Sequence, residues 1–221
     1  MHNTTYHIGV DPGYQGGITV LNANGDFVEI YSMPTIKQKM PKNKTKTSYD
    51  LKKIVSILQK YKDNNVYFAI EKVGPRPLEG TVSSFNFGMG YGQLQGIAQA
   101  FNFEIVMIPP QTWKKVFPEL ITSDFESLKE QAKKIKLENK ELERTISEKN
   151  KDEQKQIKES IKSNKKEIES LNRKVKKEAK SQSRNLAAKL FPSLKDQFVK
   201  TNEDGKSDSL LIAVYAQKSK L

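Results

Sequence analysis

The sequence predicts an α/β protein with a mixed five-stranded sheet, flanked by helices and interrupted by an inserted pair of antiparallel helices. Short apolar runs alternate with amphipathic segments over most of the chain, and the first three runs follow one another closely, as in an antiparallel meander. Residues 123–182 differ from the rest, with dense charge and neither Gly nor Pro. We therefore expect one domain from residues 1–122 and 183–221, and an inserted helical hairpin at residues 123–182.

Three strands are expected at the start of the chain, over Tyr6–Val10, Ile18–Asn22 and Phe27–Met33. Asn24-Gly25 between the second and third strands favours a tight hairpin turn, because both residues tolerate positive φ. Residues 36–47 carry alternating lysines, and we expect a loop there that is either solvated or in contact with phosphate.

Later segments alternate between helix and strand, which predicts parallel strands joined by helices. Ser48 is expected to cap the first helix, and Phe191-Pro192 ends the helical segment that precedes the last helix. The expected helices are Tyr49–Tyr61, Ser83–Phe101 and Gly205–Lys218, and the expected strands are Val66–Glu71 and Glu104–Ile108.

Four glycines lie within the second expected helix, where each costs about 1 kcal/mol relative to alanine. They are Gly88, Gly90, Gly92 and Gly96. Their presence indicates close backbone packing, for which a second copy of the chain is one partner.

The inserted segment shows heptad spacing. Leu128, Ile135 and Leu142 repeat every seven residues, as do Ile161 and Ile168 further along. With a turn near residues 150–152, this pattern predicts an antiparallel coiled-coil hairpin with a narrow apolar seam.

Composition limits the function classes. Lys plus Arg number 38 against 26 Asp plus Glu, a net charge of +12, which favours a polyanionic partner but also fits a basic solvated surface. The absence of cysteine excludes disulfides and thiolate metal sites. We expect no signal peptide, no membrane span and a cytoplasmic location.

Three acids stand at the ends of elements expected to be buried. Asp11 and Glu71 end the first and fourth strands, and Asp208 lies near the start of the last helix. Singly, each has an ordinary explanation as a turn, helix-start or ion-paired residue. Together they are expected to meet at one edge of the sheet, where such a cluster is stable only if a cation neutralises it.

Hard oxygen ligands suit Mg²⁺ or Mn²⁺. Two such ions about 4 Å apart can hold the attacking and leaving oxygens of a phosphodiester displacement. Asp11 is the residue that we expect to bridge both ions.

The ordered motifs resemble those of RuvC-type Holliday junction resolvases, particularly the phage forms. They are IGVDPG, AIEK, PPQTWKK, the Lys180–Pro192 pattern K-x-x-S-x-x-x-A-x-x-L-F-P, and DGKSDSLLIA, and they cover the chain except residues 123–178. The resemblance implies an RNase H-like fold, a homodimer, and paired Mg²⁺-dependent nicks in four-way DNA junctions. It assigns metal ligation to Asp11, Glu71 and Asp208.

One position departs from the family pattern. A further ligand is common three residues before the last aspartate, where this chain has Gly205. Asp204 is the expected substitute, because residues four apart share a helix face, although it also suits an N-cap. Glu203 is the alternative.

The resemblance also places a lysine near the scissile phosphate, and Lys114 is favoured over Lys115 for that position. The remaining DNA-contact candidates are Arg76, Phe85 (with Phe87), Lys42 and Lys44. Phe85 and Phe87 suit base stacking at a junction centre, and equally core or dimer packing.

Other functions fit parts of the pattern. A nuclease acting on flaps, forks or RNA hybrids would use the same chemistry. An actin-like or sugar-kinase ATPase shares the opening hairpin but needs more chain, and a non-catalytic DNA-binding scaffold would use the coiled coil and not the acids.

Overall fold

The computed structural model describes residues 4–41, 44–74, 80–199 and 204–219. The chain divides into two compact units, Met1–Phe117 with Ser183–Leu221, and Pro118–Gln182. Over the described residues, no helix is long and apolar enough to cross a membrane.

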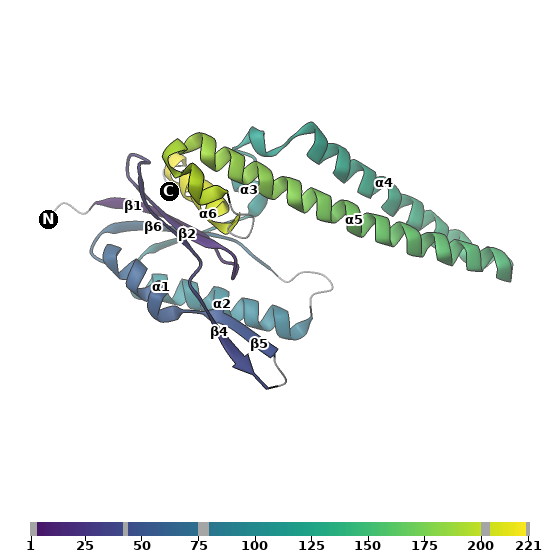
Figure 1. The fold of residues 1–221 in the computed structure, drawn as a ribbon, viewed down its shortest axis with the longest axis horizontal. Coiled ribbons are helices and arrows are strands. Elements are labelled where there is room, and N and C mark those ends of the chain that lie inside the picture. Colours follow the sequence, from purple (N-terminus) through teal and green to yellow (C-terminus); the bar gives the residue numbers. More distant parts are fainter. Residues whose placement is uncertain (1–3, 42–43, 75–79, 200–203, 220–221) are drawn as a thin grey trace. The chain divides into compact units, whose positions relative to one another are not determined.

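A five-stranded mixed sheet forms the centre of the first unit (Figure 1). Its spatial order is β3-β2-β1-β6-β7, in which β1, β2 and β3 pair antiparallel while β6 and β7 run parallel to β1. Gly25 turns the β2–β3 hairpin at φ +86°, as the Asn-Gly pair predicts. The strands are β1 (Thr5–Asp11), β2 (Gly17–Asn22), β3 (Phe27–Ser32), β6 (Asn65–Glu71) and β7 (Glu104–Ile108).

The two faces of the sheet are covered by different helices (Figure 1). Helices α1 (Leu51–Leu58) and α2 (Thr81–Ala100) pack on the face that carries Ile8, Val10 and Phe68. Helix α6 (Asp204–Lys218) covers the opposite face. Since neighbouring residues of a strand point to opposite faces, the strands separate an apolar core on one side from the contacts with α6 on the other.

Helix α6 lies unusually close to the sheet. A Cβ at Gly9 would collide with the backbone of Ser209 and Ala213, and a Cβ at Gly17 would lie 2.7 Å from the carbonyl oxygen of Gly205. Leu210, Leu211, Ile212 and Ala213 are fully buried. Glycine on the strands therefore lets the backbone of α6 rest directly on β1 and β2.

The lysine-rich segment after β3 is a hairpin, so the prediction of a loop over residues 36–47 is wrong. Strands β4 (Thr35–Met40) and β5 (Lys44–Tyr49) pair antiparallel as a separate two-stranded sheet (Figure 1). We name it the ribbon. No apolar alternation marks it in the sequence, because its faces carry lysine and threonine rather than a core-facing row.

The first helix starts later than predicted. Tyr49 ends β5, and Asp50 caps α1 by accepting a hydrogen bond from the Lys53 backbone N–H at 3.0 Å. Ser48 lies within the ribbon instead. Both residue types are good N-caps, so the sequence alone did not distinguish them.

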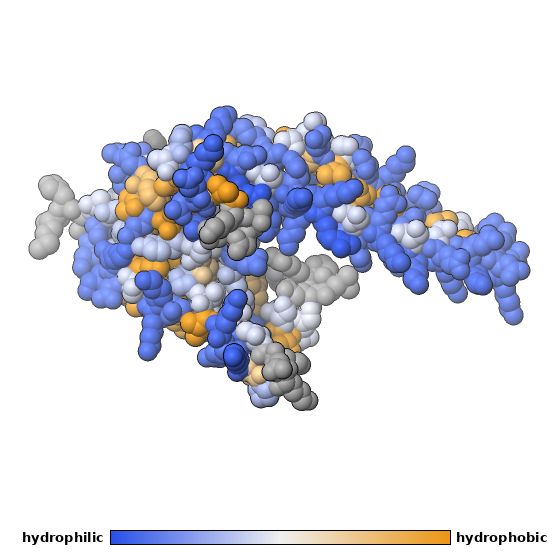
Figure 2. Space-filling view, in the orientation of Figure 1, coloured by the Kyte–Doolittle hydropathy of each residue, from blue (hydrophilic) through white to orange (hydrophobic). Residues whose placement is uncertain are grey.

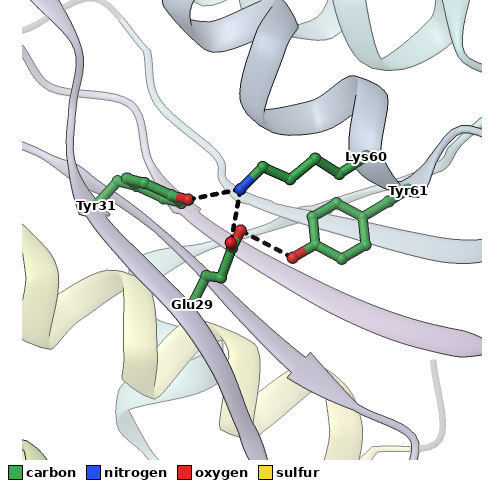
Figure 3. A network of polar contacts seen from close by, with 4 residues as sticks. All are labelled: Glu29, Tyr31, Lys60 and Tyr61. Atoms are coloured by element: carbon green, nitrogen blue, oxygen red, sulfur yellow. Dashed lines mark hydrogen bonds and ion pairs between the residues drawn. The ribbon is translucent and has the colours of Figure 1, made fainter.

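A polar network fastens the end of this helical segment, the 3-10 turn η1 (Gln59–Tyr61), to strand β3 (Figure 3). Lys60 Nζ donates to Glu29 at 2.6 Å and to the Tyr31 hydroxyl at 2.9 Å, while the Tyr61 hydroxyl donates to Glu29 at 2.9 Å. Burial raises the pKa of Glu29, but these hydrogen bonds outweigh it and the net shift is downward. The network therefore favours the charged carboxylate.

Three short elements complete the connections. Helix α3 (Pro110–Lys114) follows β7 directly, η2 (Pro118–Leu120) follows α3, and η4 (Pro192–Phe198) precedes α6. None of the three was predicted from the sequence, and each begins at a proline, whose fixed φ suits a first helical position.

The second unit contains two long helical segments that pack side by side. They are α4 (Ser123–Thr145) and the part of α5 (Lys151–Leu190) up to Gln182, joined through the 3-10 turn η3 (Ile146–Glu148). Asn150 and Glu153 form a reciprocal capping box at the start of α5, with N···O distances of 3.0 and 3.1 Å. On the face that Figure 2 shows, these helices are mostly hydrophilic, with a few hydrophobic side chains among them.

The contact between α4 and α5 is polar at its centre. Asn164 Nδ2 donates to Asn139 Oδ1 at 2.9 Å, and Asn139 is only 6% exposed. Ala132, Ile161 and Leu171 are buried on the same contact. The heptad pattern included Ile161 and Leu171 but not Ala132, and the asparagine pair was missed because its residues are polar.

Candidate functional site

Two of the predicted acids end neighbouring strands at one edge of the sheet. Asp11 is the last residue of β1 and Glu71 the last of β6, and Val10 lies opposite Ile70 in the parallel register. Gly9 faces α6, and Asp11, two residues later, shares that face. The strand ends therefore hold both carboxylates on the side of the sheet that α6 covers.

Helix α6 adds the third acid to this edge. Gly205 packs against the loop at Gln15 and Gly16, and the Ser209 hydroxyl shares a hydrogen bond of 2.8 Å with Thr19. Asp208 lies between these two contact points, and its Oδ1 atom is buried. The first turns of α6 are thus fixed over the ends of β1 and β2.

The charges of Glu71 and Asp208 both act on Asp11. Burial, followed by the charges of Asp208 and Glu71, raises the pKa of Asp11 from its ordinary 3.8 to about 7. The Gly13 backbone N–H, which donates to Asp11 Oδ1 at 3.2 Å, and the charge of Lys114 oppose the rise. The edge therefore concentrates negative charge that the surrounding protein neutralises only in part.

Helix α3 supplies contacts to the same cluster. The indole Nε1–H of Trp113 donates to Glu71 Oε1 at 3.0 Å, and Trp113 is fully buried. Lys114 follows it, with Nζ 4.9 Å from the centre of the Trp113 ring, and its charge acts on Asp11. A rigid donor thus orients Glu71, and a cation lies beside Asp11.

Asp204 has a different environment. It is 6% exposed, and its carboxylate forms an ion pair with Arg184 near the end of α5. The same residue begins α6, where its carbonyl oxygen accepts a hydrogen bond from the Ser207 hydroxyl at 2.6 Å. Asp204 and Asp208 share a helix face because they are four residues apart. The charge of Asp204, however, is already neutralised by Arg184.

Some of the other predicted contact residues lie apart from the carboxylates, and the rest lie outside the described residues. Lys115 is exposed beside Lys114, and Phe85 is 69% exposed on α2, while Phe87 is partly buried. Arg76, Lys42 and Glu203 lie outside the described residues, as does the side chain of Lys44.

Three residues with contacts at or near this edge were not identified from the sequence. Trp113 orients Glu71, Arg184 neutralises Asp204, and the Tyr49 hydroxyl donates to the carbonyl oxygen of Pro12, next to Asp11. For Trp113 the signals were its place in the PPQTWKK motif, directly before Lys114, and its being the single tryptophan of the chain. Arg184 and Tyr49 act through tertiary contacts that leave no local pattern.

The donor set suits hard divalent cations, because it consists of carboxylate oxygens. Across the described part of the chain, no three His, Cys, Asp or Glu side chains are close enough to enclose one metal ion. Any cation at this edge would therefore be held by fewer than three of these side chains, together with other ligands. The raised pKa of Asp11 is the observation that fits such cations, because a nearby positive charge would favour the ionised carboxylate.

Neither a scan against models of protein families nor a search of curated proteins returns a match for this chain.

Proposed function

We propose that this protein is a metal-dependent endonuclease that resolves four-way DNA junctions by phosphodiester hydrolysis, similar to RuvC-type resolvases. The observation that carries the proposal is the convergence of Asp11, Glu71 and Asp208 beside Lys114, with the pKa of Asp11 raised to about 7. A buried carboxyl group with a raised pKa and nearby acidic charges is typical of functional sites. The net charge of +12 fits a polyanionic substrate.

The fold is compatible with this reading. An antiparallel meander followed by two parallel strands, with helices on both faces, agrees with the RNase H-like fold that the resemblance implies. Fold alone does not define function, so the proposal depends on the carboxylates.

Two Mg²⁺ ions, or Mn²⁺ in their place, would supply an activated water and stabilisation of the departing 3′ oxygen. Asp11 would bridge the pair, with Glu71 on one ion and Asp208 on the other. Asp204 could bind either ion only if its ion pair with Arg184 were broken, so we do not include Asp204 among the proposed metal ligands.

The chain's own residues hold this arrangement in place. The Gly13 N–H fixes one oxygen of Asp11, and Trp113 fixes one oxygen of Glu71. Lys114 contributes a positive charge on the same edge, where it can offset negative charge that develops on the scissile phosphate. Positioning of this kind reduces the reorganisation that the reaction requires.

Paired nicks need two copies of the site, and helix α2 offers a surface for a homodimer. Val82, Phe85 and Met89 are exposed on one side of α2, at 75%, 69% and 43%. Gly88, Gly92 and Gly96 lie on that side, and an added Cβ at each would meet no other described residue within 4 Å. A second α2 packed against this stripe would bury the apolar side chains and explain the glycines.

The helices of the second unit form, in this proposal, an antiparallel coiled coil. Buried and half-buried positions together follow alternating spacings of three and four along α4 and α5, and the Asn139–Asn164 hydrogen bond would fix their register. We assign this unit no part in the chemistry.

Cleavage of labelled DNA tests the function. Four-way, forked and linear duplex substrates are each incubated with the protein in Mg²⁺, Mn²⁺ or EDTA. We expect symmetric nicks that require metal and are confined to the four-way substrate. Cutting of forks or flaps as well would indicate a nuclease of broader specificity with the same site.

Two substitutions make the test specific. Asp11→Asn is expected to abolish cleavage while junction binding in EDTA remains. Asp63→Asn, the same change at an exposed aspartate beyond η1, is the control and should cut normally. Undiminished cleavage by Asp11→Asn would contradict the proposal and favour a non-catalytic role for the acids.

A further inference from the structure

The ribbon concentrates positive charge on an exposed surface. The sequence from Thr35 to Tyr49 contains Lys37, Lys39, Lys42, Lys44 and Lys46 and no acid. Lys37, Lys39 and Lys46 are exposed. Lys37 and Lys39, two residues apart, share a face, and the residues opposite them, Thr47 and Thr45, are uncharged. The ribbon therefore presents neighbouring cations without compensating charge on the facing strand.

The ribbon also lacks the features of a structural sheet. It forms a sheet separate from the five-stranded one, and its apolar residues Ile36 and Met40 are 41% and 44% exposed. A two-stranded hairpin without a core has little stability of its own, and like charges along it reduce that stability further. A polyanion laid along the ribbon would relieve this repulsion.

The root of the ribbon is fixed to the loop that follows Asp11. The Met33 N–H donates to the Gly16 carbonyl at 2.9 Å, and the Tyr49 hydroxyl donates to the Pro12 carbonyl. The Tyr49 ring packs edge-on against Tyr14, with 5.1 Å between ring centres, and Gly90 of α2 makes room for it, because a Cβ there would lie 2.5 Å from that ring. The root of the ribbon is thus in contact with the loop that directly follows Asp11.

From this juxtaposition we propose that the ribbon binds the phosphate backbone of one duplex arm of the DNA. The inference rests on the proposed nuclease function and adds the element that holds the substrate. A two-stranded ribbon has the width to enter or follow a DNA groove. With its root on the Asp11 loop, an arm held along the ribbon has a defined position relative to the carboxylates.

The test is junction binding in EDTA, measured by fluorescence anisotropy over a range of salt concentrations. Each phosphate contact contributes about 0.9 to the slope of log affinity against log salt. Lys37→Gln with Lys39→Gln should reduce the slope by up to about 1.8 and weaken binding by up to about eightfold per contact near 0.1 M salt. Lys37→Arg with Lys39→Arg, which keeps both charges, should bind like the wild type.

Lys62→Gln provides the matched control, since Lys62 is an exposed lysine before β6, at the opposite end of the strands from Asp11. Wild-type slope and affinity in the variant with Lys37→Gln and Lys39→Gln, or an equal loss in Lys62→Gln, would overturn the role of the ribbon.

The cleavage assay separates this inference from the proposed function. If the ribbon has no role in binding but the wild type cuts junctions in Mg²⁺, the proposed function stands without the ribbon. If the wild type binds but never cuts, the nuclease assignment fails while ribbon binding is still decided by the slope. If the wild type does not bind branched DNA, both fail.

Discussion

Replacement of Asp11 by asparagine should stabilise the metal-free protein, although it removes the residue on which the site depends. The amide oxygen of the new side chain can still accept the hydrogen bond from Gly13, but the amide carries no charge to repel Glu71 and Asp208. A rise in pKa from 3.8 to about 7 corresponds to roughly 4 kcal/mol of destabilisation once the pH exceeds both values. Because Asp11 keeps partial contact with solvent, we expect a gain of about 2–4 kcal/mol at pH 8.

Because folding raises the pKa of Asp11, the stability gained by Asp11→Asn depends on pH. The folded protein holds a proton on Asp11 more tightly than the unfolded chain does, so wild-type stability from this group falls as the pH rises from about 4 to about 7. The advantage of Asp11→Asn should therefore be small at pH 4 and complete at pH 8. Added Mg²⁺ should offset most of this advantage, because only the wild type gains about 2.7 kcal/mol at a concentration one hundred times the dissociation constant.

The assay is urea unfolding in EDTA and in Mg²⁺, followed by tryptophan fluorescence. Trp113 is the single tryptophan and lies in the unit that contains the site, so the signal reports that unit. Asp63→Asn should change stability by less than about 0.5 kcal/mol under all conditions. Lower stability of Asp11→Asn in EDTA at pH 8, together with an undiminished response to Mg²⁺, would refute the reasoning.

Three further predictions concern other parts of the chain. Trp113→Phe removes the donor to Glu71 and should raise the metal concentration for half-maximal cleavage by roughly 10- to 100-fold, with junction binding in EDTA unchanged; an unaltered metal requirement would exclude the positioning role. Burial lowers the pKa of His7, so its contribution to stability should be present above about pH 6.5 and lost as the pH falls below it, and His7→Phe should remove that dependence in urea unfolding; the same pH profile in both proteins would exclude it. Deletion of residues 123–182 with a short linker should leave metal-dependent cleavage in place; complete loss of cutting in a well-folded deletion would show that the helical pair belongs to the active enzyme.

The sequence predicted the central sheet because each of its strands is a short apolar run. It placed Asp11, Glu71 and Asp208 at one edge because strand ends share an edge and the last helix can pack across them, and that convergence stays a prediction. Both inferences rest on hydrophobic residues, because hydrophobicity is the sequence signal that indicates which segments are buried.

Features that depend on polar contacts were missed. The ribbon has no apolar row, and its strands are paired through backbone hydrogen bonds between lysine-bearing segments. The Asn139–Asn164 pair occupies positions where the heptad pattern expects apolar residues. Trp113 and Glu71 are 42 positions apart, so only the fold brings the donor to the acceptor.

The account depends most on the ability of the carboxylate edge to hold divalent cations. Calorimetric titration of Mn²⁺ into the full chain, without DNA, measures this directly. We expect saturable binding that Asp11→Asn abolishes, that Glu71→Gln or Asp208→Asn weakens, and that Asp63→Asn leaves unchanged. Equal binding by the wild type and Asp11→Asn, or no binding by either, would contradict the central claim.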